Sequence, residues 1–254
     1  MNTYRKNAVI AGTLYFLGTV FGVLGAVVGG EVLTSIISGK PLVGVDILSL
    51  AAANSSRLTA GSFLIFLMGI SLVAMTIFLY PVLRKASKEL AMGMVLFRGA
   101  LEGVFYFLST LTFLTLTAVG NTYVTTGADS AVLQTIGNLL YQFVSLKAPV
   151  SSIIFLIGAT CIYLAFYRTR LIPRWLSVWG FIGVATSLAA ALLNFFHMDP
   201  GIGFYLEMVI APQELAMAVW LIVKGFNPSA IAALLEKREI PKKMAQFESA
   251  SLQA

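Results

Sequence analysis

The sequence has little charge for its length. Of its 254 residues, 11% are charged and 58% are hydrophobic, whereas a soluble domain has about 25% charged residues. A chain this apolar cannot cover its own surface in water, so we expect an all-α protein that spans the membrane as a helical bundle. A β-barrel is excluded, because its strands would alternate in hydrophobicity over about ten residues, and the apolar runs here are continuous.

Cysteine and histidine occur once each, as Cys161 and His197. One cysteine allows no disulfide within the chain, and metal or haem sites usually take several His or Cys ligands. No Walker or dinucleotide glycine motif is present, and Lys147 is expected at a helix end rather than in mid-span, where a Schiff base would need it. We therefore expect no metal, no cofactor and no catalytic residue, and favour a protein that is not an enzyme.

The formal net charge of +6 comes from short basic clusters that separate the apolar runs. In a soluble protein a basic balance can indicate nucleic-acid binding, but this spacing is the pattern that orients membrane helices. The expected partner is the lipid bilayer and not a nucleic acid, and a small-molecule or lipid ligand is a further candidate partner.

Six apolar runs are long enough to cross a bilayer of about 30 Å. They cover residues 8–29, 59–82, 90–119, 149–167, 174–196 and 202–224. When the runs alternate in direction, Lys and Arg outside them divide thirteen to three between the two sides. Because basic residues collect on the cytoplasmic side, the pattern predicts a multi-pass cell-membrane protein with both termini in the cytoplasm.

The connections predict how the chain is divided. Residues 1–226 are expected to form one six-span domain, and residues 227–254 a cytoplasmic amphipathic helix with a mobile tail. The outer connections are longer than the inner ones and contain segments typical of short interfacial helices. One of them, residues 130–146, either rests on the outer leaflet or extends the fourth span outward across Pro149.

Gly18, Gly22, Gly25 and Gly29 lie along one face of the first span. Glycine removes side-chain bulk and lets another backbone approach closely. The spacing therefore predicts tight packing against a helix of the same chain. The alternative is a homodimer through this face.

Three charged residues are predicted deep in the bilayer, where a charge costs at least ~2.5–3.5 kcal/mol on insertion scales and so usually faces protein or water. Arg98 lies ten residues after Lys88, and Glu214 lies ten residues before Lys224, each about 15 Å of helix rise. These two residues should share one depth, with Glu102 one turn further out. Arg before Glu is the less favourable order within one helix, so we expect Arg98 to reach Glu214 if the third and sixth spans touch.

Pro212 interrupts the sixth span two residues before Glu214. It cannot donate to the carbonyl of Met208, so we expect a kink that places polar groups at the midplane, as in many transporter sites. The predicted ligand-binding residues are Arg98, Glu102, Tyr106, Gln213 and Glu214.

Three functions fit these features. The leading hypothesis is a non-enzymatic membrane protein whose midplane site binds or passes a small polar or amphiphilic ligand. The second is a structural or accessory membrane subunit in which the Arg–Glu pairing only locks helices together. The third is an intramembrane enzyme that uses the paired glutamates, which requires a water path to them.

Three stretches together resemble a bacterial family of six-span membrane proteins known only as a domain of unknown function. They are residues 97–102 (FRGALE), residues 170–180 (RLIPRWLSVWG), and Pro212-Gln213-Glu214 followed by Lys224-Gly225-Phe226. The resemblance implies the same six-span architecture and a bacterial inner membrane. It implies no activity, substrate or catalytic residue.

Overall fold

The computed structural model describes residues 3–37, 42, 44–126 and 130–236, and this part of the chain is helical without a strand. The helices are α1 Thr3–Ile37, α2 Ile47–Ala53, α3 Ser55–Ala86, α4 Lys88–Gly93, η1 Met94–Leu101, α5 Glu102–Thr126, α6 Ala131–Thr169, α7 Arg174–Phe195, α8 Gly203–Glu207 and α9 Ile210–Val223. Residues 228–236 form a further helical segment. The predicted tail beyond it, residues 237–254, lies outside the described residues.

Six helical stretches in the described part of the chain are long and apolar enough to cross a membrane, which confirms the predicted fold class and number of spans. The third stretch combines α4, η1 and α5, and the sixth combines α8 and α9 across a break at residues 208–209. The break lies one turn before Pro212, as expected for a residue that cannot donate to the carbonyl of Met208. The protein is therefore a multi-pass helical membrane protein.

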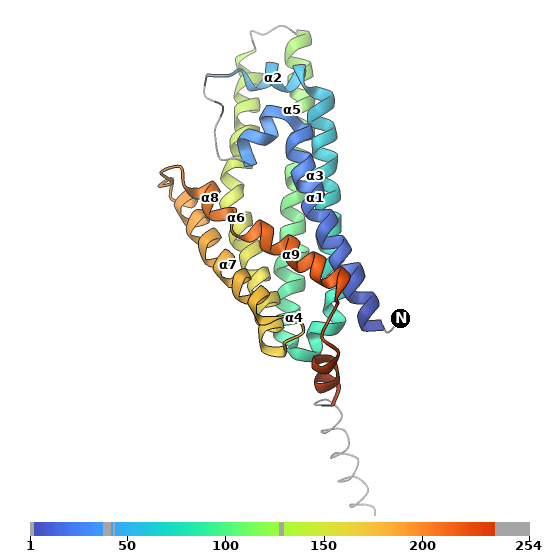
Figure 1. Cartoon of the computed structure of the whole chain (residues 1–254). Coiled ribbons are helices and arrows are strands. Elements are labelled where there is room, and N and C mark those ends of the chain that lie inside the picture. Colours follow the sequence, from blue (N-terminus) through green and yellow to red (C-terminus); the bar gives the residue numbers. More distant parts are fainter. Residues whose placement is uncertain (1–2, 38–41, 43, 127–129, 237–254) are drawn as a thin grey trace, which may run out of the picture.

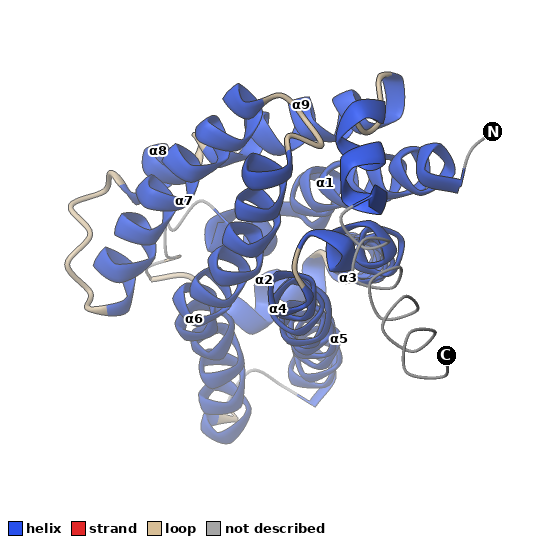
Figure 2. Ribbon diagram, turned by 90° about the horizontal axis from the view of Figure 1, so that it is seen from below, coloured by secondary structure: helices blue, strands red, loops and turns tan. Residues whose placement is uncertain are grey.

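The spans form a closed ring in chain order. Contacts join α1 to α3, α3 to α5, α5 to α6, α6 to α7, α7 to α9, and α9 back to α1. Figure 2 looks along the bundle and shows this order, with α7 and α8 on the side opposite α3. The third and sixth spans thus both face the interior of one bundle.

The helices are longer than the apolar runs, chiefly at one end of the bundle. Figure 1 shows α5 and α6 continuing well beyond the end of α7. This extension has its own core, in which Leu48 of α2 packs with Leu116 and Tyr123 of α5 and with Tyr141 of α6. Apolar runs measure only the stretch that lipid surrounds, and helices continue past it where protein packing supports them.

The fourth span is one continuous helix of 39 residues that contains Pro149. The outer segment therefore extends span four, and the option that it rests on the leaflet is wrong. Lys147 lies within this helix, so its expected place at a helix end is also wrong. Tyr141 helps to hold the outer part of α6, because its hydroxyl is 3.0 Å from the Ser35 hydroxyl and accepts from the backbone N–H of Leu42 at 3.2 Å.

The first span bends at Gly30, whose φ of 74° and ψ of −157° are not helical. Glycine tolerates this conformation at little steric cost. The bend turns residues 31–37 away from the direction of the rest of α1, toward the region beneath α2 (Figure 1). Arg57 of α3 donates to the carbonyls of Val27 and Val28, each at 3.3 Å, and so supplies partners near the bend.

The glycine face of α1 packs against α3 of the same chain. A Cβ added at Gly61 would lie 2.5 Å from the Cα of Gly29 and 2.8 Å from the carbonyl oxygen of Gly25, so the two backbones are in direct contact. At Gly22 an added Cβ would meet the Met68 side chain, with Sδ at 2.8 Å. This packing occupies the surface that the sequence suggested for a homodimer. The homodimer itself stays a prediction, and it would need a different face of the protein. The glycines concerned are Gly18, Gly22, Gly25 and Gly29.

Candidate functional site

Arg98 is held inside the bundle by a local change of helix type. It lies in η1, a π-helical stretch in the third span, and only 2% of its side chain is exposed. An α6 residue, Gly158, contacts the Arg98 backbone so closely that an added Cβ would lie 2.6 Å from the Arg98 nitrogen. Short π-helical stretches are rare and are frequent at functional sites. Nothing in the apolar sequence around Arg98 predicts this one.

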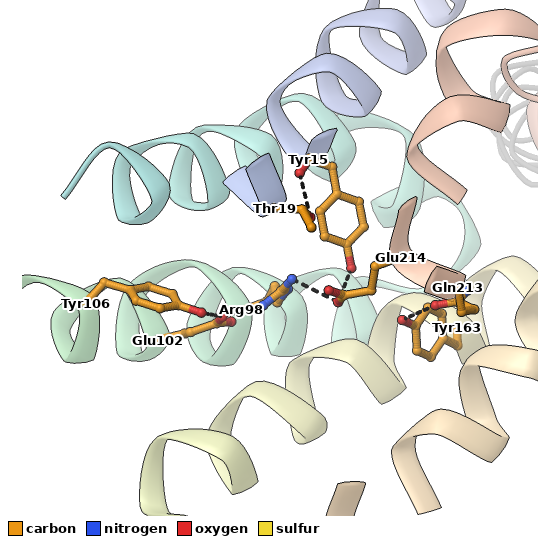
Figure 3. Close-up of polar contacts among 8 residues, drawn as sticks. All are labelled: Tyr15, Thr19, Arg98, Glu102, Tyr106, Tyr163, Gln213 and Glu214. Carbon is orange, nitrogen blue, oxygen red and sulfur yellow. Dashed lines mark hydrogen bonds and ion pairs between the residues drawn. The ribbon is translucent and has the colours of Figure 1, made fainter. Parts of the chain in front are cut away.

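Arg98 pairs with both glutamates. Its Nη1 donates to Oε1 of Glu102, and its Nη2 donates to Oε1 of Glu214 at 3.1 Å. Figure 3 shows Arg98 between the two carboxylates, with Glu214 reaching in from α9. The expected ion pair between Arg98 and Glu214 is present. The pair between Arg98 and Glu102, which lies within the third span, is present as well. Two glutamates therefore share one guanidinium.

Each glutamate also accepts a hydrogen bond from a tyrosine. The Tyr106 hydroxyl donates to Oε1 of Glu102 at 2.9 Å, and the Tyr15 hydroxyl donates to Oε1 of Glu214 at 2.5 Å. Sequence reasoning missed Tyr15. It lies ten residues after Arg5, about 15 Å of helix rise, so the sequence predicts the depth of Arg98 for it, but depth alone does not single out one aromatic residue among many.

Gln213 is buried beside this group but has different partners. Its Oε1 accepts from the Tyr163 hydroxyl at 2.7 Å, and its Nε2 donates to the carbonyl of Leu176 at 2.9 Å. The amide thus ties α9 to α6 and α7 (Figure 3). Of the five predicted site residues, four form the charged group, and Gln213 anchors the helix that carries Glu214.

Aromatic rings flank the guanidinium of Arg98. Its Cζ lies 4.4 Å from the ring centroid of Phe155 and 5.3 Å from that of Tyr15. A cation near a ring face is attracted by the quadrupole of the ring, most strongly where water is excluded. These contacts fix the plane of the guanidinium. Phe155 gives no signal in the sequence, since it is one of many apolar residues in its span.

Two buried polar atoms of the charged group have no hydrogen-bond partner among the described residues. They are Nε of Arg98 and Oε2 of Glu102. Buried polar atoms normally have a partner, so each exception needs an explanation. Glu102 also lines a cavity of about 90 Å³, which is large enough for several water molecules. The other lining residues are Phe105, Tyr106, Lys147, Ser151, Ser152 and Phe155.

The lining of the cavity combines a carboxyl group and an amine from two helices. Glu102 and Tyr106 come from α5, and Lys147, Ser151 and Ser152 come from α6. The arrangement offers acceptors at Glu102, donors at Lys147, and hydroxyls that can do either. Within the described residues no group of three or more His, Cys, Asp or Glu side chains could hold a metal ion.

One comparison with known proteins found a relative. The family model described as Domain of unknown function (DUF4386) matches residues 10–225, in agreement with the resemblance predicted from three stretches of the sequence. Neither the curated proteins nor the solved structures contain a match. The comparisons therefore supply a family and no activity.

Proposed function

We propose that this chain, which belongs to the family Domain of unknown function (DUF4386), is a non-enzymatic membrane protein that binds or passes a small polar or amphiphilic ligand. The site is the group formed by Arg98, Glu102, Tyr106 and Glu214, with Gln213 as its anchor. One observation carries the proposal. Oε2 of Glu102 is buried without a partner among the described residues, and Glu102 lines a cavity that could hold one.

The lining of the cavity defines the chemistry of the ligand. A group that donates hydrogen bonds would bind at Glu102, and a group that accepts them would bind at Lys147. The volume of about 90 Å³ admits a ligand, or a part of a ligand, of only a few heavy atoms. A small zwitterion, or the polar head of an amphiphile, has this combination of groups.

The charge bias supports an orientation for this site. Basic clusters near Arg5, Arg84, Arg174 and Lys224 favour a topology with both termini in the cytoplasm, and the family resemblance favours a bacterial inner membrane. Glu102 then lies on the outer side of Arg98, and Lys147 further out again. A ligand would reach the cavity from the outer half of the bilayer.

The structural alternative rests on the same contacts. The ion pairs of Arg98 and the two tyrosine hydrogen bonds join α1, the third span and α9, which would suffice to lock helices together. A pure lock, however, leaves the cavity beside Glu102 without a role. An intramembrane enzyme would use the same cavity as its water path, with the glutamates as acid and base.

Chemical labelling of the cavity tests the binding proposal. In a Cys161→Ala background, Ser152→Cys should react with small methanethiosulfonates that carry a positive or a negative charge. Glu102→Gln should lower the ratio of cation to anion reaction rates by roughly threefold to tenfold, and Lys147→Gln should raise it, because each removes one nearby charge. Rates are measured by mass spectrometry on protein in membranes.

The matched control is Glu207→Gln, which removes a glutamate that does not line the cavity and should leave the ratio unchanged. Ser145→Cys, on an exposed part of α6, reports that the reagents reach the protein. If Ser145→Cys reacts and Ser152→Cys does not, the cavity is closed to solutes. The binding proposal is then wrong, and the structural lock is supported.

A further inference from the structure

Two turns meet at the end of the bundle that carries the described start of α1. One joins α6 to α7, and the other follows α9. The backbone N–H of Asn227 donates to the carbonyl of Leu171 at 2.9 Å and holds the turns side by side. Arg5 fixes the second turn, since its guanidinium donates to the carbonyls of Ile222 and Val223 at 2.8 and 2.9 Å.

A cavity of about 670 Å³ lies between these turns, well away from Glu102 and Lys147. Its lining includes Arg170, Arg174 and Lys224, together with Trp220 and Asn227, and among the described residues it includes no Asp or Glu. The volume is in the range of small-molecule sites, which is about 300–1,000 Å³. Three basic residues thus line one concave surface, and no acidic residue of the described part of the chain lines it with them.

Arg170 occupies a backbone position that favours glycine. It ends α6 in the left-handed conformation, with φ 56° and ψ 29°. Helices commonly end this way, but the residue is usually glycine, because a Cβ is strained there. The fold alone would be served better by glycine. Arg170 at this position is one of the residues that line the cavity.

Arg174 also occupies a position that local structure does not favour. It is the first residue of α7, and the first turn of that helix contains no acidic residue. The helix macrodipole favours negative side chains at this end and disfavours positive ones. The bias of basic residues toward the cytoplasm requires cations near a membrane boundary, but it does not require them at a left-handed cap and at a helix start. Residues that break local rules are often functional.

We propose that this cavity binds a phosphate group, with Arg170, Arg174 and Lys224 as its cationic ligands. Guanidinium groups match the geometry of phosphate oxygens and can bind two of them at once. Trp220 in the lining, and the stacked Trp175 and Trp179 nearby on α7, place the cavity at the membrane interface. The phosphate can belong to an anionic phospholipid or to a soluble phosphate compound. This site is independent of the proposed function.

Arg170→Gly separates binding from folding. Because glycine relieves the strained backbone, the variant should unfold at the same temperature as the parent protein or higher. Its affinity for the phosphate-bearing ligand should fall roughly tenfold, the effect of losing one charge-assisted contact. The full chain in detergent is titrated with phosphatidylglycerol and, for comparison, phosphatidylcholine, and bound lipid is counted by native mass spectrometry. Titration with inorganic phosphate, followed by calorimetry, forms a second arm.

The control is Arg84→Gln, which removes a cation that packs on Tyr80 and does not line the cavity. Selective binding of phosphatidylglycerol that Arg170→Gly weakens and Arg84→Gln spares identifies a lipid site. The same pattern with inorganic phosphate identifies a soluble ligand. The proposal is wrong if neither phosphatidylglycerol nor inorganic phosphate binds, if Arg170→Gly weakens the binding of neither, or if Arg84→Gln weakens binding as much as Arg170→Gly does.

Discussion

Arg98→Met is expected to destabilise the folded protein by roughly 3–5 kcal/mol, because it leaves a buried ion group without its cation. Glu102 and Glu214 both pair with Arg98, and their side chains are only 2% and 13% exposed. Methionine keeps much of the volume and the contacts with Phe155. The loss would therefore come mainly from the unpaired carboxylates. Thermal unfolding in detergent and the yield of monodisperse protein measure it.

The triple variant Arg98→Met, Glu102→Gln, Glu214→Gln is the control for this prediction. It removes every charge of the group, and replacing a whole buried ion group often costs little stability. We expect it to recover most of the yield lost in Arg98→Met, and to shift the selectivity of the cavity toward anionic reagents, because Glu102 is neutralised while Lys147 remains. If Arg98→Met is as stable as the parent protein, the ion pairs do not hold the helices. If the triple variant is no better than Arg98→Met, the loss comes from packing rather than from charge.

Gly61→Ala is expected to cost about 1–3 kcal/mol, the usual effect of forcing an extra methyl group into a packed interior. The added Cβ would lie within 2.5 to 2.8 Å of backbone atoms of Gly29 and Gly25, and backbone cannot move aside as a side chain can. The α1–α3 contact would have to open along its length. The midpoint of thermal unfolding in detergent should fall accordingly.

Gly22→Ala is the matched control on the other side of the same contact. Its Cβ would meet the Met68 side chain, which has three rotatable bonds and can take another rotamer. The variant should stay close to the parent in stability. Equal losses from Gly22→Ala and Gly61→Ala would show that the contact is equally rigid throughout, contrary to this account. If neither variant lowers stability, α1 and α3 are less closely packed than described above.

The fold was largely predictable because a bilayer constrains a chain along one direction. Its thickness sets the length of each apolar run, and basic residues mark where runs end. The rise of a helix then converts positions in the sequence into depths, which is why Arg98 and Glu214 could be matched before any contact was known. The predicted fourth run was shorter than α6, because the outer part of α6 is also supported by packing on α2 and α5.

The site was predictable only in part, because only its charged residues are unusual in an apolar span. Charged residues stand out in an apolar span, so Arg98, Glu102 and Glu214 were found. Their partners Tyr15 and Phe155 were not, since aromatic residues are common in such spans, and Lys147 was placed at a helix end that does not exist. The cavity beside Glu102 depends on all of these side chains at once.

The sequence by itself determined the number of spans, their alternation and the depth of the deep charges. Only the tertiary structure decided which faces meet. Apolar residues cover both the inner and the outer faces of these helices, as Leu72, which is 2% exposed, and Phe63, which is 58% exposed, show on α3. Hydrophobicity therefore carries little information about rotation around the helix axis. That rotation is set by close packing between distant residues, such as Gly158 against Arg98, and it creates the site.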